Sequence, residues 1–140
     1  MGELLYSSTR GGETGCTASE AVLKGLAKDG GLFMPERIPR FDFALPELKD
    51  ASYQEAAYRV MRLLLTDYSE EELRACIEGA YDEKFDTPEI APLTFADDAY
   101  YLELFHGKTI AFKDMALSIL PYLMTTAAKK NGVTNKIEIL

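Results

Sequence analysis

Three segments of the chain begin with Ser or Thr followed three residues later by Glu, and this spacing constrains the fold more than any other feature. The segments start at Thr17, Ser52 and Ser69. In such a pair, the hydroxyl oxygen and the carboxylate each accept a hydrogen bond from a backbone N–H group at the start of a helix. The sequence therefore predicts three capped helices in its first 90 residues.

The apolar residues after these caps recur at helical intervals. The first helix is predicted to end at residues 29–31, Asp-Gly-Gly, where a glycine can adopt a left-handed conformation. Its buried side is predicted to consist of Ala21, Val22, Gly25 and Leu26. The second helix is predicted to end at residues 66–67, and the buried side of the third to consist of Leu73, Cys76, Ile77 and Ala80.

Strand-like segments flank these helices. Residues 4–9 are predicted to form a short strand, and the glycine-rich residues 11–15 are interpreted as a structural turn. Residues 93–95 and 99–105 are predicted to form two strands joined by a polar turn at Asp97 and Asp98. The change of pattern near residues 86–92 predicts a domain boundary, with an N-terminal α+β domain over residues 1–90 and a second domain over residues 91–140.

The second domain is predicted to be the beginning of a parallel sheet. Residues 113–130 are predicted to form an apolar helix, and Pro121 is expected either to kink this helix or to displace its start. Asn131 and Gly132 are predicted to end the helix, and residues 136–140 are predicted to begin a strand. Strand, helix, strand is the order of a parallel α/β unit, and one such unit cannot cover both faces of a parallel sheet. The sequence therefore predicts an α/β fold that is incomplete at its C-terminus.

Composition excludes several classes of partner. The net charge is −8 and the basic residues form no stripe, so nucleic acid is not expected as a partner. No apolar run reaches the length that spans a membrane, and the first residues do not match a secretion or myristoylation signal. Cys16, Cys76 and His106 lack the spacing of metal ligands, so no metal is expected, and a reducing cytoplasm is the predicted compartment.

Residues 103–114, Glu-Leu-Phe-His-Gly-Lys-Thr-Ile-Ala-Phe-Lys-Asp, resemble the cofactor-lysine segment of threonine synthases. In that family, Gly-x-Thr-x-Ala-Phe-Lys-Asp precedes an apolar helix. Residues 6–11 and 25–36 resemble the N-terminal domain of the same family. The resemblance implies a fold-type-II pyridoxal-phosphate enzyme that converts O-phospho-L-homoserine and water into L-threonine and inorganic phosphate, with Lys113 as the residue that binds the cofactor.

The resemblance also makes Lys113 the catalytic base. A lysine amine condenses with the aldehyde of the cofactor, and once the substrate amine displaces it, the free amine can take the α-proton of the substrate. This role requires a neutral amine near neutral pH, which burial in an apolar pocket favours. Ala111 and Phe112 are expected to supply the apolar approach.

Five residues that lie near Lys113 in the sequence, or in a segment that resembles the family, have more than one possible role. Asp114 is interpreted as a first-turn carboxylate favoured by the helix dipole, with orientation of neighbouring groups as the alternative. His106 is interpreted as a structural group rather than an acid or base, and Thr109 as bonded to backbone or to cofactor. Arg10 is interpreted as a structural or surface group with substrate phosphate as the alternative, and Lys108 stands where many family members have proline.

The glycine-rich turn that holds the cofactor phosphate in fold-type-II enzymes is not found after Lys113 and is expected beyond Leu140. The 140 residues alone are therefore expected to be inactive. Two alternatives stay open: a related pyridoxal-phosphate-dependent phospho-lyase or dehydratase that uses the same lysine, and a non-catalytic assembly module. The sequence carries no feature that specifies an oligomeric state.

Overall fold

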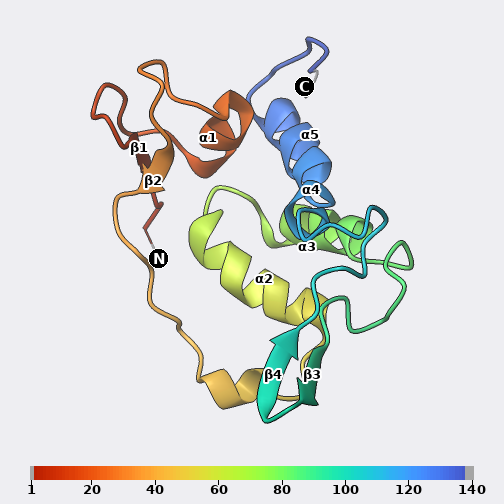
Figure 1. Ribbon diagram of the computed structural model, residues 1–140. Coiled ribbons are helices and arrows are strands. Elements are labelled where there is room, and N and C mark those ends of the chain that lie inside the picture. The colour runs from red at the N-terminus through yellow and green to blue at the C-terminus, as the bar shows by residue number, and fades with distance from the viewer. Residues whose placement is uncertain (1, 138–140) are drawn as a thin grey trace.

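The computed structural model describes residues 2–137 as a mixed α/β fold (Figure 1). Its elements in chain order are β1 (Tyr6–Ser8), α1 (Ala18–Lys24), β2 (Phe33–Pro35), a 3₁₀ helix η1 (Leu45–Leu48), α2 (Tyr53–Leu64), α3 (Glu70–Ala80), β3 (Leu93–Ala96), β4 (Ala99–Leu102), α4 (Asp114–Leu117) and α5 (Leu120–Lys130). The three capped helices are confirmed as α1, α2 and α3. The segment that contains η1 carried no such signal.

Two of the three caps form in full as the sequence predicts, and the third forms in part. The hydroxyls of Thr17, Ser52 and Ser69 each accept a hydrogen bond from the backbone N–H three residues later. At Thr17 and Ser69 the backbone N–H of the capping residue in turn donates to the carboxylate of the glutamate. At Ser52 only the hydroxyl participates, because the carboxylate of Glu55 binds two arginines of α2 and α3 instead. Glu55 therefore ties two helices together rather than completing its own cap.

The first helix is shorter than predicted. It ends at Lys24, because Gly25 takes a left-handed conformation with φ 67° and donates its N–H to the carbonyl of Ala21. The prediction that the helix continues to residues 29–31 is wrong. Leu26, which was expected on its buried side, lies beyond the helix and is 59% exposed. The glycine that ends the helix is thus the first one available.

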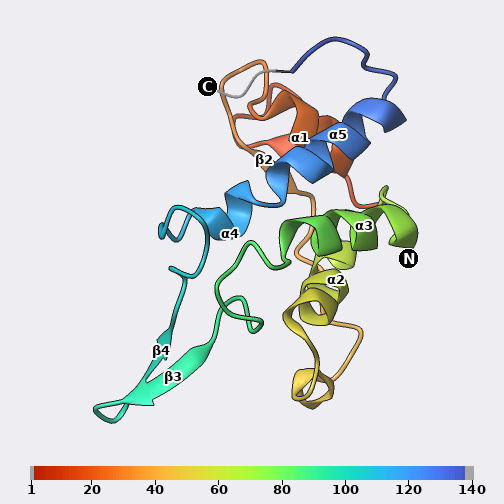
Figure 2. The same ribbon diagram turned by 90° about the vertical axis from the view of Figure 1, so that its right-hand side faces the viewer.

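Both sheets consist of two antiparallel strands. β1 pairs with β2, with Tyr6 opposite Pro35, and β2 itself is a strand that the sequence did not predict. β3 pairs with β4 through a turn at Asp97 and Asp98, which have φ of 48° and 59°, as tight hairpins require. This hairpin is confirmed, although its second strand ends at Leu102 rather than at residue 105. Figure 2 shows it extending away from the helices.

The expected parallel sheet stays a prediction. Among residues 2–137 every strand pair is antiparallel. Lys136 and Ile137 lie outside any strand, and the remainder of the predicted strand, residues 138–140, lies outside the described residues.

The core lies between α3 and α5, with one side of α2 packed against it. Its buried residues are Tyr68, Leu73, Cys76, Ile77, Ala80, Tyr81, Phe85, Ile90, Ile119, Leu123 and Ala127. All four residues predicted on the buried side of α3 are among them. The hydroxyl of Tyr68 donates to the carbonyl of Leu123, and Asn131 donates to Ser19 of α1. The core thus draws on both sides of the predicted boundary at residue 90, and the division into two domains stays a prediction.

Pro121 divides the last helical segment, as predicted. α4 ends at Leu117 and α5 begins at Leu120, so that Pro121 lies in the first turn of α5, where no N–H donor is needed. α5 ends at Lys130 and is capped by Asn131, which is followed by Gly132 with φ 64°. The break lets α5 pack against α1 and α3 while α4 extends toward the hairpin (Figure 2).

Candidate active site

Lys113 is the residue immediately before α4, and its side chain lines an apolar cavity of about 460 Å³. The walls of this cavity are Tyr53, Ala91, Leu102, Leu104, Phe112, Met115 and Ala116. They come from α2, from β4 and the loops beside it, and from α4. The β3–β4 hairpin and α4 therefore both contribute to the cavity beside Lys113, the lysine that the sequence motif identified.

Burial of Lys113 was expected and is not observed. The side chain is exposed, and Phe112 beside it is 68% exposed. The apolar approach is half confirmed: Phe112 lines the cavity, whereas Ala111 is exposed and is not part of its wall. Among the residues that the structure describes, the cavity that Lys113 lines does not enclose its side chain.

Asp114 is a buried carboxylate that organises the loop before it. Its side chain accepts hydrogen bonds from the backbone N–H and the hydroxyl of Thr109, at 2.7 and 2.6 Å. The residue is 5% exposed. The interpretation of Asp114 as a helix-dipole carboxylate alone is therefore wrong, because both oxygens bind one residue of the preceding loop. The hydroxyl of Thr109 donates to the side chain of Asp114, which is neither of its two expected partners, and a bond from Thr109 to the cofactor stays a prediction.

His106 bridges two carboxylates. Nδ1 lies 2.5 Å from Oδ1 of Asp86, and Nε2 lies 2.7 Å from Oε2 of Glu103. The hydrogen bond to Glu103, followed by that to Asp86, raises the pKa of His106, while the bond to His106 lowers the pKa of Glu103. Both ring nitrogens are engaged, which agrees with a structural role that ties the loop at residue 86 to the end of the hairpin.

Arg10 and Lys108 do not converge on Lys113 through any contact in the described residues. Arg10 follows β1 and donates from Nη1 to the backbone carbonyl of Asp29, at 2.9 Å. Figures 1 and 2 both separate the β1–β2 sheet from the loop before α4. Lys108 lies in that loop with an exposed side chain, and it is not part of the cavity wall. Of these two lysines, only Lys113 therefore lines the cavity among the residues that the structure describes.

The glycine-rich turn at residues 11–15 is structural, as interpreted. The carboxylate of Asp29 accepts hydrogen bonds from the N–H of Gly12, from the N–H of Gly31 and from the hydroxyl of Ser8. The bond from Ser8, followed by that from Gly31, lowers the pKa of Asp29. The carboxylate of Asp29 thus links the turn between β1 and α1 to the turn between α1 and β2.

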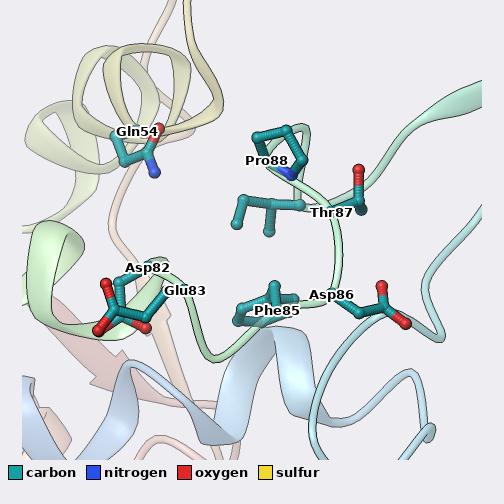
Figure 3. A pocket seen from close by; sticks show the side chains of 8 residues that line it. Gln54, Asp82, Glu83, Phe85, Asp86, Thr87 and Pro88 are labelled. Carbon is teal, nitrogen blue, oxygen red and sulfur yellow. The ribbon is translucent and has the colours of Figure 1, made fainter.

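A second cavity, of about 450 Å³, was not predicted from the sequence (Figure 3). It is lined by Gln54, Asp82, Glu83, Phe85, Asp86, Thr87, Pro88 and Ile90. The acidic residues Asp82, Glu83 and Asp86, which follow α3, are the sequence feature that could have indicated this cavity. In Figure 3, Asp82 and Glu83 lie on one side and Asp86 points away from them. These carboxylates would repel a dianionic phosphate, so the cavity does not suit the phosphate end of a cofactor.

Two further classes of site are not found in the described part of the chain. Within residues 2–137, no three or more His, Cys, Asp or Glu side chains are grouped so that they could hold a metal ion. No helix of these residues has both the length and the apolar character needed to cross a membrane.

Known proteins are similar to this chain in sequence and in fold. Threonine synthase from Schizosaccharomyces pombe is 43% identical over 135 residues, which cover 93% of this chain and 26% of that protein. Pyridoxal-phosphate-bound threonine synthase from Brucella melitensis has a TM-score of 0.81 at 32% identity, over 92% of this chain and 28% of that one. Threonine synthase from yeast has a TM-score of 0.80 at 34% identity, over 94% and 28%.

The chain therefore spans between a quarter and a third of the length of these proteins. The family pattern described as "Threonine synthase N terminus" matches residues 5–81, more than half of the 140 residues. The matched region ends at Tyr81, the residue after α3, and the alignments with the relatives extend over the hairpin and the lysine loop as well. On this evidence the chain belongs to the threonine synthase family, whose N-terminal region it contains.

Proposed function

We propose that the gene product carrying this chain is a threonine synthase that converts O-phospho-L-homoserine and water into L-threonine and phosphate, with pyridoxal phosphate bound to Lys113. The observation that carries the proposal is the position of Lys113, whose side chain lines an apolar cavity where the hairpin meets α4. The pyridoxal-phosphate-bound relative from Brucella melitensis supports the choice of cofactor.

The described residues fit one end of this cofactor. Lys113 offers the primary amine that reacts with an aldehyde, and Phe112, Leu102 and Leu104 offer apolar surface to the ring. The phosphate end needs backbone N–H groups at the start of a helix. Among residues 2–137, the start of α2 at Tyr53 and the four-residue α4 border the cavity, and neither follows a glycine-rich turn of the kind that cradles a phosphate. The proposal therefore assigns the phosphate, and the parallel sheet, to a part of the gene product outside these residues.

Lys113 has two tasks in this reaction. Its Nζ would hold the cofactor, and, once free, the same Nζ would take the proton from the substrate α-carbon and return it later in the reaction. When bound, the cofactor supplies an electron sink for the charge that develops at the α-carbon. Removal of a β-proton would expel the substrate phosphate from the γ-carbon, the γ-carbon would then gain a proton to become the methyl group, and water would add at the β-carbon.

The test is an assay of the complete gene product with O-phospho-L-homoserine, in which phosphate and threonine are measured separately. We expect both products in equal amounts, and loss of both in Lys113→Ala. Lys108→Ala is the matched control, because Lys108 lies in the same loop but is not part of the cavity wall.

Three other outcomes would contradict the proposal. Phosphate release without threonine would favour the related phospho-lyase or dehydratase. No turnover and no cofactor binding would favour the non-catalytic assembly module. Full turnover by Lys113→Ala would remove the lysine from the reaction while leaving the family membership intact.

A further inference from the structure

Ile110 has a backbone conformation that a β-branched residue rarely adopts. Its φ is 65°, in the left-handed region that favours glycine. Its side chain is 72% exposed, so burial of the side chain does not account for this conformation. A residue held in such a region persists only where surrounding interactions fix the backbone on both sides of it. Ile110 is three residues before Lys113.

Asp114 provides these interactions on both sides of Ile110. Its carboxylate accepts two hydrogen bonds from Thr109, the residue before Ile110, at 2.7 and 2.6 Å. Its own backbone N–H donates to the carbonyl of Ala111, the residue after Ile110, at 3.0 Å. Asp114 therefore holds the two neighbours of the strained residue at a fixed separation.

The position of Asp114 is itself constrained. The residue is 5% exposed, and a Cβ atom added at Gly107 would overlap its side chain. The carbonyl of Gly107 accepts the N–H of Ile110 at 3.1 Å, which closes the turn. The absence of a side chain at Gly107 thus permits the close approach of the Asp114 side chain to the turn.

We propose that Asp114 is a positioning residue, whose brace on Thr109 and Ala111 holds the strained loop so that Lys113 stays at the apolar cavity. This proposal rests on the proposed function in one respect, that Lys113 is the amine that reacts. The peptide that carries Lys113 is held between the brace and α4, because its carbonyl accepts the N–H groups of Ala116 and Leu117 at 3.0 and 2.8 Å. Loss of the brace frees one end of this segment.

The first experiment measures amide hydrogen exchange at Thr109 in the absence of cofactor. Asp114→Asn keeps the shape of the side chain but replaces its two charged acceptor oxygens by one neutral carbonyl oxygen and an NH₂ group, so that the bonds of Thr109 to a charged group are lost. We expect exchange at Thr109 to become about tenfold faster, which corresponds to about 1.4 kcal/mol for a lost hydrogen bond to a charged group. Exchange at Leu123 and Ala127 in α5 stays unchanged, which shows that the core is still folded.

Asp98→Asn is the matched control. It makes the same chemical change at the hairpin turn, at a residue with φ 59° that asparagine also tolerates. We expect no effect on Thr109. A conservative pair gives a further check: Thr109→Ser keeps both donors and should exchange like the parent, whereas Thr109→Val loses the hydroxyl donor and should resemble Asp114→Asn.

The second experiment titrates the complete gene product with pyridoxal phosphate and then traps the bound cofactor by reduction. We expect Asp114→Asn and Thr109→Val to raise the dissociation constant about tenfold and to spread the trapped cofactor over other lysines, while Thr109→Ser and Asp98→Asn bind as the parent does. An unchanged dissociation constant in Asp114→Asn, with or without faster exchange at Thr109, would overturn the positioning role.

Failure of the proposed function gives a different result. In that case Lys113→Ala keeps its covalently bound cofactor, and the trapped residue in the parent is another lysine. The positioning proposal fails on its own when Lys113 is the trapped residue and Asp114→Asn leaves both its share and the dissociation constant unchanged.

Discussion

The helical core and the hairpin-and-lysine region, residues 93–117, use apolar side chains in opposite ways. In the core, Leu73, Ile77 and Ala80 are at most 1% exposed. In the hairpin-and-lysine region, large apolar side chains are half or more exposed: Leu93, Phe95, Tyr100, Tyr101, Leu102, Phe105, Ile110, Phe112 and Leu117. The core is thus stabilised by burial, whereas the lysine loop is held by a few polar contacts.

Because of this difference, the core contributes mainly to the stability of the chain, whereas the hairpin-and-lysine region carries the residues of the candidate site. Burial contributes roughly 25 cal/mol for each Å² of apolar surface removed from water, and most of that gain lies in the three core helices. The loop before α4 depends instead on the Thr109–Asp114 bonds, and the end of the hairpin on the His106 bridge. Substitutions in the two regions should therefore affect different measurements.

The largest expected difference is in the free energy of unfolding. Ile77→Ala removes a side chain that is 1% exposed and should lower this free energy by about 2–5 kcal/mol. Phe95→Ala removes a larger side chain that is 60% exposed and should change it by less than about 1 kcal/mol. Urea denaturation of both variants measures the effect. Equal losses in the two variants would break the comparison.

The next effect concerns the 140 residues by themselves. They should make no threonine, and they should bind pyridoxal phosphate weakly, because the described residues supply no amide cradle for its phosphate. Three modest lost interactions would weaken binding by roughly a hundredfold relative to the complete gene product. Phosphate release and cofactor titration measure this. Turnover by the 140 residues that disappears in Lys113→Ala would contradict it.

Proteolysis should also distinguish the two regions. We predict that the first portion, to about residue 90, resists a protease while cleavage occurs near residues 86–98, where the chain leaves the core. The fragment with α5 should stay bound after cleavage, since Ile119, Leu123 and Ala127 belong to the same core. Limited digestion followed by mass spectrometry identifies the sites. Cleavage spread evenly through residues 17–80 would contradict both the comparison and the proposed domain boundary.

The smallest effect is a pH dependence at the end of the hairpin. The pKa of His106 is raised above its ordinary 6.5, first by its hydrogen bond to Glu103 and then by that to Asp86. A raised pKa in the folded state means that the stabilisation is complete below about pH 6.5 and is lost as the pH rises through the folded value. Opening of the segment around the Asp86 amide, which donates to the carbonyl of His106, should therefore increase as the pH rises above about 6.5.

Hydrogen exchange at the Asp86 amide, corrected for the intrinsic pH dependence of exchange, measures this effect. His106→Gln should remove the pH dependence without changing exchange in α3. A pH dependence that persists in His106→Gln would assign it to another group.

Much of the helical core could be predicted from the sequence because its signals are local. Thr17, Ser52 and Ser69 specify where helices begin, and Pro121 specifies where one is divided, through contacts within a single turn. The end of α1 was placed too late because two glycine sites competed, and the sequence does not say that Gly25 turns first. The β2 strand was missed because it has three residues and its pairing with β1 depends on a distant segment.

The candidate site was predicted only in part, for the same physical reason. The motif identified Lys113, but the cavity beside it is assembled from α2, the hairpin and α4, which are far apart in the sequence. The role of Asp114 was also underestimated, because its bonds run backward into a loop whose turn depends on the left-handed Ile110. No local pattern predicts a left-handed isoleucine.

The central claim is that Lys113 is the residue that binds pyridoxal phosphate. The most direct test is to load the complete gene product with the cofactor, reduce the bond between them with borohydride, digest the protein and locate the modified lysine by mass spectrometry. The account predicts one cofactor per chain on the peptide that contains Lys113, and no stable adduct in Lys113→Ala. An active enzyme that carries its cofactor on Lys108 or on any other lysine would contradict the account.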